Sequence, residues 1–467
     1  MPGQSSSPGS RELAELHGLV ADLRTEIALL KDELTKRDER VTELERLLAE
    51  ARRSGKRQAA PFSKGEPAAD PKRPGRRSGD AHGRHGHRMA PAGPIDREFD
   101  APLPACCPHC GGEVELDHVA EQFAVDLPDP RPVTTKFNVS VGRCRSCKSR
   151  VQGRHPAQST DALGAAASGV GPVAKSWAAW LHYSLGLSFG KSAAVLARLG
   201  VPATAGALCA AAQSTSTALA PVTREIVRRL NASEMIVSDE TGWRVRGGRT
   251  WLWAATSTAV TAYWVADGRG YDEACEVIDP NYSGVMVRDG WAPYRNFTAA
   301  THQTCLAHLL RRCDELVRDL PEEARETPRT VRQLLKDALR ARELGPRKRK
   351  AVAGELNERL EVLISTEQSH DENRKLLKHL GNEKDAVFTF LTHNGVDATN
   401  WRGEQAIRPA VVNRKVWGGN RTWRGAETQG RIMSVIRTAA QQGVDVVEYL
   451  TGVARAPTPA DLPSLFS

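Results

Sequence analysis

Few cysteines and no long hydrophobic run are present in this 467-residue sequence, and each shortage excludes a class of protein. Nine unevenly placed cysteines are too few for a disulfide-stapled scaffold. No stretch of about twenty uncharged apolar residues could span a bilayer, and the N-terminal segment lacks the basic-then-apolar layout of a signal peptide. We therefore expect a cytoplasmic protein with no membrane partner.

Positive charge is what the sequence has in excess. The formal net charge is +9 and the isoelectric point is near 9.1. Lys and Arg that neutralise phosphates supply most non-specific nucleic-acid affinity, so this balance favours a polyanionic partner. Ribosomal and membrane-surface proteins carry similar charge, so charge alone does not identify the partner. The length allows about three domains at roughly 150 residues each.

A leucine-rich segment predicts a coiled-coil helix over residues 1–51. Apolar residues recur there with 3-4 spacing, and only Arg37 interrupts them. Such a seam favours a two-stranded parallel coiled coil, and hence a homodimer or a higher oligomer. A single amphipathic helix docked on its own protein is the alternative. The seam residues are Leu13, Leu16, Val20, Leu23, Ile27, Leu30, Leu34, Val41, Leu44 and Leu48.

Residues 52–100 are rich in Pro, Gly, Ser, Arg and His, and predict a basic disordered linker. Such a segment cannot bury enough apolar surface to order itself. We expect it to contribute electrostatically to DNA binding. His82, His85 and His87 are spaced too loosely to predict a metal site.

Two Cys-x-x-Cys pairs predict a zinc ribbon over residues 101–155. The first lies in "CCPHCGG" and the second in "GRCRSCKSR", with alternating, strand-like residues between them. Four thiolates give one structural Zn²⁺ a closed tetrahedral shell with no open position for catalysis. Cys106 is then the spare thiol, although a slip of one residue stays open. The predicted ligands are Cys107, Cys110, Cys144 and Cys147.

Residues 165–231 predict a helical region. Within it, "FGKSAAVLARLGVPATAGALCAAAQ" resembles a helix, a turn at Gly200 and a second helix. A helix-turn-helix DNA reader and an ordinary helical pair explain this pattern equally well.

Strand-like runs follow Ser233 and predict a catalytic core whose first part spans residues 232–310. The runs "EMIVSDETGWRV", "RTWLWAATS" and "AVTAYWVAD" predict an antiparallel meander. A short helix, "YDEACEVI", leads to a fourth run, "GVMVRDGWAPY", which again ends in an aspartate. If this run lies beside the first and parallel to it, Asp239 and Asp289 share one sheet edge on strands roughly 5 Å apart.

That spacing suits two carboxylates that hold a pair of divalent cations. Both aspartates also lie in good turn sequences, so a purely structural interpretation stays open. We expect Asp239 at the last position of its strand, with Thr241 and Gly242 letting the chain leave it. Glu240 then points to the opposite face and is the weaker ligand candidate. A hairpin turn explains Asp267 better than a metal site does.

A third acidic candidate, Glu404, precedes a run of cations interleaved with tryptophans in "NWRGEQAIRPAVVNRKVWGGNRTWRG". A carboxylate for a metal, cations for phosphates and flat side chains for bases suit a site that cuts DNA strands. The predicted DNA-binding residues of this run are Arg408, Arg414, Lys415, Arg421 and Arg424.

The strings "SDETGWRV…WLW", "RDGWAPY", "CLAHLLRR" and "GEQAIRPAVVNRKVWGGNR" resemble the insertion sequence 66 family of bacterial transposases, over roughly residues 170–442. The resemblance implies an α/β fold: an RNase H-like mixed five-stranded sheet with flanking helices and a helical insertion. It carries the family's two aspartates onto Asp239 and Asp289 and its glutamate onto Glu404. Gln405 stands where the family shows Arg, whereas the following Arg408 and Pro409 are kept.

A DDE transposase mechanism is what the resemblance implies. Two Mg²⁺ ions per site would be held by the three carboxylates, and the enzyme would nick transposon ends and join their 3′-hydroxyls to target DNA. Its partners would be double-stranded DNA, as terminal inverted repeats and target, and the accessory proteins that many members have encoded beside them. A zinc-ribbon DNA-binding descendant that has lost cleavage and a stand-alone nuclease are the alternatives.

The stretch between Asp289 and Glu404 is much longer than one helix needs. Residues 311–391 predict a helical insertion, and residues 392–467 predict the glutamate helix with a basic C-terminal region that completes the core. Cys305, His308 and Cys313 suggest a second metal site, but the family carries this stretch without established zinc binding. We expect a helix packed near the active site, with His308 close to DNA.

Overall fold

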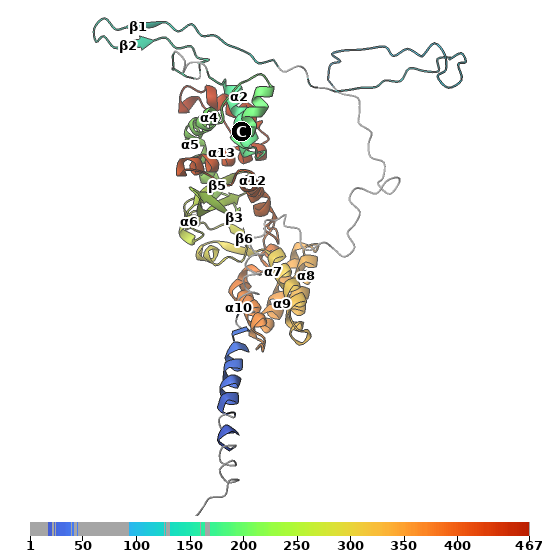
Figure 1. Ribbon diagram of the computed structural model, residues 1–467, viewed down its shortest axis with the longest axis vertical. Coiled ribbons are helices and arrows are strands. Elements are labelled where there is room, and N and C mark those ends of the chain that lie inside the picture. The colour runs from blue at the N-terminus through green and yellow to red at the C-terminus, as the bar shows by residue number, and fades with distance from the viewer. Residues whose placement is uncertain are drawn as a thin grey trace, which may run out of the picture. The chain divides into compact units, whose positions relative to one another are not determined.

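The chain is described here by a computed structural model (Figure 1) that covers residues 17–20, 23, 25–38, 40, 41, 44, 93–125, 127, 131–158, 160–163 and 169–466. It divides into two units, residues 1–90 and 91–467. Each unit is considered by itself. None of the helices within the described ranges is long and apolar enough to cross a membrane.

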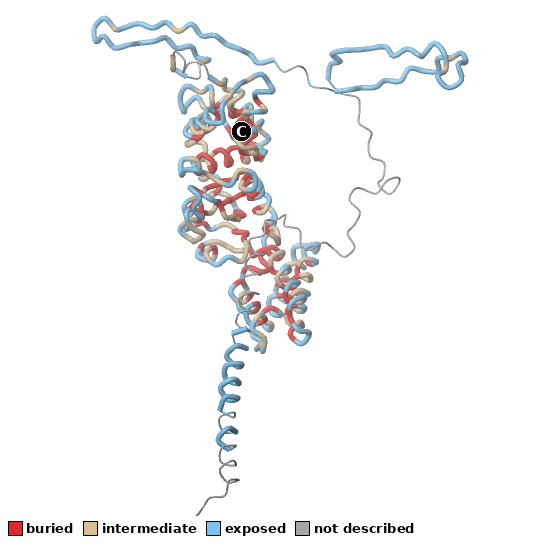
Figure 2. The backbone as a smooth tube through the Cα atoms, in the orientation of Figure 1, coloured by how far each residue is buried: buried red, intermediate tan, exposed pale blue. Residues whose placement is uncertain are grey.

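The described residues between 17 and 44 are helical, and their apolar seam is exposed. Leu30 and Leu34 are 57% and 65% exposed, and Figure 2 shows this helix as exposed along its length. A helix whose apolar seam is not covered by any described residue of its own unit has not buried, among those residues, the surface that usually stabilises it. Leu13, Leu16 and Leu48 of the predicted seam lie outside the described residues, as do residues 52–92 of the predicted linker.

Around the cysteine pairs, the regular structure within the described residues is one short hairpin. Strand β1 (Val141–Arg143) pairs antiparallel with β2 (Arg150–Gln152), on either side of the second pair. Of the strands expected between the two pairs, β1 forms just before the second pair, whereas the described parts of residues 113–140 contain none. Val119 and Val125 remain 83% and 85% exposed. Alternation alone does not make a strand where no neighbour takes its hydrogen bonds or covers its apolar side.

A five-stranded mixed sheet forms the centre of the larger unit, with strand order β5-β4-β3-β6-β7. The predicted antiparallel meander is confirmed, and β6 lies parallel to β3 as expected. This order fits an RNase H-like domain. The strands are β3 (Met235–Val245), β4 (Gly248–Thr256), β5 (Thr261–Ala266), β6 (Val285–Arg288) and β7 (Thr301–Thr304).

Helices between β7 and residue 392 share one core with the sheet. Val237 and Val287 of the central strands are buried among leucines of these helices, which include Leu309, Leu334 and Leu380. The charged helical stretch read from the sequence is thus a set of amphipathic helices with a common apolar interior. They are α7 (Leu306–Asp319), α8 (Glu326–Ala341), α9 (Pro346–Ser365), α10 (Asp371–Glu383) and α11 (Thr389–Thr392).

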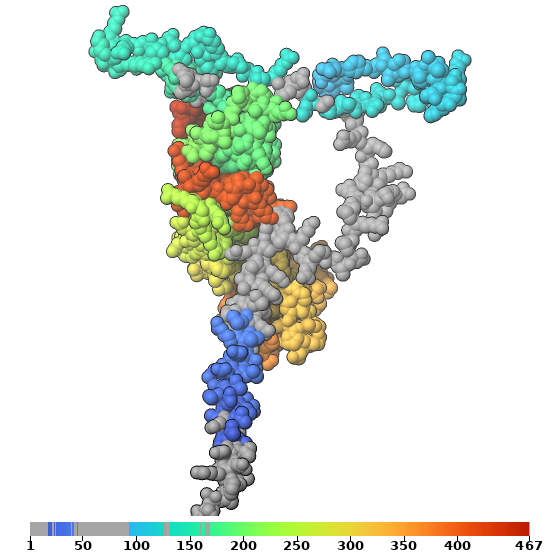
Figure 3. Space-filling model, viewed as in Figure 1, coloured from blue at the N-terminus to red at the C-terminus, as the bar shows by residue number. Residues whose placement is uncertain are grey.

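The C-terminal helices lie between the sheet and an upstream helical layer, as the red, yellow-green and green regions of Figure 3 show. The upstream helices are α2 (Pro172–Tyr183), α3 (Phe189–Arg198), α4 (Ala205–Ala218) and α5 (Ala220–Asn231). Helix α6 (Tyr271–Cys275) lies between β5 and β6. The C-terminal helices are α12 (Trp401–Trp417), α13 (Trp423–Gln441) and α14 (Val446–Arg455).

Helix α13 seals the outer strand β5. Its Gly430 lies against the backbone of Tyr263, where a Cβ would meet the Tyr263 carbonyl oxygen at 2.7 Å. One turn further, Ser434 accepts a hydrogen bond from the Tyr263 N–H at 2.8 Å, and Thr438 accepts one from the Thr261 N–H at 3.1 Å. Small polar residues four apart therefore satisfy backbone groups that an edge strand would otherwise expose.

Candidate active site

Asp239 and Asp289 lie at the same edge of the sheet. The parallel pairing of β3 with β6 ends at Val237 and Val287, and each aspartate is two residues beyond its paired valine. Because side chains alternate along a strand, Asp239 points to the same face of the sheet as Val237. The register thus places the two carboxylates side by side where the central parallel strands diverge.

Strand β3 does not end at Asp239, which corrects the sequence-based expectation. It continues to Val245 and stays paired with β4 through the pair Val245 and Gly248. Thr241 and Gly242 remain inside the strand because Arg414 of α12 packs across them. The Arg414 guanidinium donates to Thr241 Oγ1 at 3.1 Å and to the Gly242 carbonyl oxygen. The sequence does not reveal this long-range contact, and read locally it favours a turn.

Glu404 enters the site on the first turn of α12, and Asn400 fixes where that helix begins. The Asn400 side-chain amide donates to the carbonyl oxygen of Ser238 at 3.2 Å, next to Asp239. The Asn400 backbone N–H donates to Cys305 Sγ, also at 3.2 Å. One residue therefore ties the glutamate helix to β3 and to the start of α7.

His308 is a common neighbour of the three carboxylates. Its Nε2 lies 3.9 Å from Glu404 Oε1, and it interacts electrostatically with Asp239 and Asp289. The interaction with the Cys305 side chain is the main cause that raises the pKa of His308 to about 9, so the protonated imidazole is favoured at neutral pH. His308 lies on a helix close to the site, as expected. Its imidazole supplies positive charge among the acids.

Burial, followed by the negative charges of Glu240 and Asp289, raises the pKa of Asp239. Such crowding of carboxylates is relieved by a cation, and an all-oxygen donor set suits Mg²⁺. Among the described residues, no three His, Cys, Asp or Glu side chains are gathered closely enough to hold a metal between them. The acids therefore share one edge without forming a closed coordination shell.

Arg269 is a site residue that the sequence analysis missed. Its guanidinium pairs with buried Glu240 and lies 3.6 Å from Asp289 Oδ2. It is also stacked between two indoles, 4.9 Å from the Trp251 ring and 4.1 Å from the Trp291 ring. Glu240 points away from Asp239 as expected, where Tyr294 donates to it at 2.5 Å. An arginine in a Gly-Arg-Gly loop gives no local signal of this position.

A buried charge cluster contacts the backbone of Asp289. It was also not predicted from the sequence. Glu383 of α10 accepts from Arg288 at 2.5 Å and from Arg295 at 2.9 Å, and its side chain is fully buried. Arg288 in turn donates to the Asp289 carbonyl oxygen at 3.0 Å. An arginine inside the apolar run "VMVRDG" is the signal that could have predicted a buried acidic partner.

The basic residues predicted to bind DNA are not all equally accessible. Arg408 and Lys415 are exposed on α12, and Arg421 and Arg424 are exposed beyond its C-terminal end. Arg414 is half-buried against β3, as described above. The tryptophans also differ, since Trp401 and Trp423 are exposed whereas Trp417 stacks on His182 with ring centroids 4.6 Å apart.

The two cysteine pairs adopt the same turn. The Cys107 carbonyl oxygen accepts from the Gly111 N–H, and the Cys107 N–H donates to the Gly112 carbonyl oxygen. Cys144 makes the same two backbone bonds with Lys148 and Ser149, and all four are 2.8–3.0 Å long. Gly111 and Lys148, at equivalent positions, share a positive φ of 75° and 61°. The four thiols are not gathered into one cluster among the described residues.

The chain matches the Transposase IS66 family over residues 168–428, which is more than half of its length. The matched range contains the whole five-stranded sheet and every residue of the site described above. No curated protein matches the chain.

Proposed function

The chain belongs to the IS66 family of transposases, and we propose that it cuts DNA at transposon ends and joins those ends to target DNA through Asp239, Asp289 and Glu404. The observation that carries the proposal is their convergence. Two neighbouring parallel strands bring Asp239 and Asp289 to one edge, and His308 interacts electrostatically with both aspartates and lies 3.9 Å from Glu404.

The residues at this edge fit divalent cations. All three ligand candidates are carboxylates, and crowding already disfavours the charged form of Asp239. Asp239, Asp289 and Glu404 would hold two Mg²⁺ ions. The chemistry such ions supply is activation of water and stabilisation of the leaving 3′ oxygen.

The chain's own side chains have supporting roles in this proposal. Arg269 and His308 balance negative charge before DNA arrives, and Asn400 keeps Glu404 in reach of the aspartates. Exposed Arg408, Lys415, Arg421 and Arg424 would bind phosphates. Cleavage breaks the phosphorus–oxygen bond at the transposon end and leaves a 3′-hydroxyl. That hydroxyl then displaces a 3′ oxygen from a phosphodiester of target DNA, so no covalent protein–DNA bond is formed.

A joining assay tests the proposal. Purified protein, Mg²⁺ and a labelled transposon-end duplex are incubated with plasmid, and joined product is measured. Asp239→Asn, Asp289→Asn and Glu404→Gln should each abolish joining. Asp267→Asn is the matched control, because exposed Asp267 also follows a strand of this sheet and should not matter.

Each alternative has its own outcome in the joining assay. Cleavage without joining would indicate a nuclease, and binding without cleavage would indicate a regulator. Full activity in the Asp239→Asn protein would refute the assignment of the residue.

We extend the proposal to the cysteine pairs, in which one Zn²⁺ would be held by four thiolates and order the ribbon. The shared turn supports this, because both halves present their thiols from the same backbone geometry. Elemental analysis should find one zinc per chain. Cys107→Ser with Cys110→Ser should remove it, whereas Cys106→Ser should retain it.

The exposed apolar seam of the N-terminal helix supports a dimer through a coiled coil. Light scattering should show that residues 1–51 are needed for a defined oligomer. Accessory proteins encoded beside the gene would be further partners.

A further inference from the structure

The far end of β3 carries a group of five arginines, three of which have no role in the proposed function. The β3–β4 hairpin contributes three of them and the segment after α12 contributes two, and all are exposed. Three of them, Arg244, Arg246 and Arg421, line a hollow of about 300 Å³ together with Gly418, Gly419 and Asn420. We name this set the distal arginine cluster; its members are Arg244, Arg246, Arg249, Arg421 and Arg424.

No acidic side chain in the described part of the chain forms a salt bridge with any of the five. This distinguishes them from Arg269, Arg288 and Arg295 at the active site, each of which is paired with a carboxylate. Their positive charge is therefore not offset within the described protein.

The positions of these arginines destabilise the hairpin. Arg244 stands directly opposite Arg249 in the antiparallel register, and like charges at such pairs are destabilising. Arg246 occupies the two-residue turn with a φ of +55°, followed by Gly247 at +80°. A turn of this kind favours Asn or Asp before Gly, because a longer side chain gains nothing there and strains the backbone. Two unfavourable choices at one tip, the facing arginines and Arg246 at a positive φ, indicate a ligand.

The cluster is held in place by Asn420. Its side chain accepts from Trp243 Nε1 at 2.7 Å, and its backbone bonds Arg244 and Arg246 at 2.9 and 3.0 Å. Gly419 lies against the Arg244 carbonyl oxygen, where no Cβ would fit. The turn after α12 is thus joined to the hairpin, and both sources of arginine form one rigid surface.

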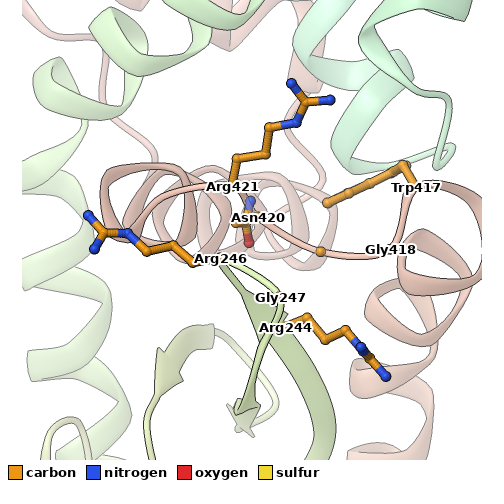
Figure 4. A pocket seen from close by; sticks show the side chains of 8 residues that line it. Arg244, Arg246, Gly247, Trp417, Gly418, Asn420 and Arg421 are labelled. Carbon is orange, nitrogen blue, oxygen red and sulfur yellow. The ribbon is translucent and has the colours of Figure 1, made fainter.

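The direction of the side chains identifies the class of ligand. Figure 4 shows the side chains of Arg244, Arg246 and Arg421 pointing away from one another. A single small anion needs converging donors, whereas a row of phosphates needs donors spread along its length. We propose that the distal arginine cluster binds the backbone of duplex DNA that extends beyond the active site, without reading its sequence.

The register sets the distance of this contact. Arg246 is seven residues past Asp239 along β3, which is roughly 23 Å at 3.3 Å per residue. That length corresponds to about seven base pairs at 3.4 Å each. The proposal rests on the DNA binding that the family implies, and its test requires no cleavage.

Fluorescence anisotropy of the full chain on duplexes lengthened in three-base-pair steps tests the proposal. Affinity of the wild type should rise once the duplex is long enough to reach the cluster. Arg244→Gln, Arg246→Gln and Arg249→Gln combined should abolish that rise. The slope of log affinity against log salt should fall by about two to three, since each lost phosphate contact removes roughly 0.9.

The control is Arg347→Gln, Lys348→Gln and Lys350→Gln, which removes equal charge from exposed positions of α9. An equal loss in this control, or a length dependence that survives in the hairpin variant, would overturn the proposal. Arg246→Asn separates function from folding: the melting temperature should rise while binding to long duplexes weakens. Unchanged binding in that variant would also contradict the cluster.

Discussion

The two ends of β3 differ in whether their charged side chains are paired. Around Asp239 and Glu240, charged side chains have partners of opposite sign, several of them buried. At the hairpin tip and in the neighbouring segment after α12, five arginines form no salt bridge with an acidic side chain of the described residues, and two of them face each other. Pairing fixes geometry at the cost of desolvation, whereas unpaired exposed charge is free to meet a ligand. One strand thus joins a preorganised site to a surface suited to binding.

The largest expected effect comes from breaking the paired end. Glu383→Gln leaves Arg288 buried without its carboxylate and weakens the hold on Asp289. Loss of one partner of a buried ion pair typically costs about 3–5 kcal/mol. The free energy of unfolding, measured in urea, should fall by that order, and joining activity should fall with it.

Glu322→Gln is the matched control for Glu383→Gln. Glu322 also accepts from two arginines, Arg325 and Arg329, at 2.7 Å each, but its side chain is 66% exposed. Exposed pairs contribute about 0–1 kcal/mol. Equal losses in the two variants would show that burial of the Glu383 cluster has no special importance.

A pH dependence should follow from His182, which stacks on Trp417 just before the turn that carries the distal arginine cluster. Burial lowers the pKa of His182 to about 4, whereas the unfolded value is near 6.5. The unfolded chain therefore binds the proton first, and stability should be lost as the pH falls from about 6.5 to 4.

The expected loss over this window is a few kcal/mol, since one pKa unit is worth about 1.4 kcal/mol. Urea unfolding at several pH values measures it. His182→Gln should flatten the dependence in that range, and an unchanged slope would remove His182 as its cause.

A smaller effect is expected where the glutamate helix meets β3. Asn400→Ala leaves the Ser238 carbonyl oxygen without its side-chain donor, at a cost of about 1–3 kcal/mol. The joining rate at saturating Mg²⁺ should fall because Glu404 is less well placed. Asn394→Ala removes only a surface bond from Arg349 and serves as the comparison. If both variants join DNA equally well, Asn400 does not position the glutamate.

The central strands and the acidic candidates could be predicted because the information is local. Alternating apolar residues predict β3, β4 and β5, and the repeated run ending in aspartate predicts the parallel neighbour β6. Strand β7 was not predicted from its residues, because "THQT" is polar and becomes a strand only through its pairing with β6.

What the sequence could not show depends on contacts between distant segments. Arg414 keeps β3 extended past Asp239, Arg269 reaches Glu240 from a loop, and Glu383 comes from a helix almost a hundred residues away. Each is a charged residue whose partner is set by the fold. Between the cysteine pairs, the described residues form a strand only at β1, where β2 pairs with it, since a strand needs a neighbour that no pattern supplies.

The most direct test of the account is to locate the divalent cation on the chain itself. Fe²⁺ in place of Mg²⁺, with ascorbate and peroxide, cleaves polypeptide near where it binds, and mass spectrometry identifies the cut positions. Cuts should fall near residues 239, 289 and 404, and excess Mg²⁺ should suppress them. Asp289→Asn should remove them and Asp267→Asn should not. Cuts elsewhere, or cuts that persist in Asp289→Asn, would contradict the assignment of this edge as the catalytic site.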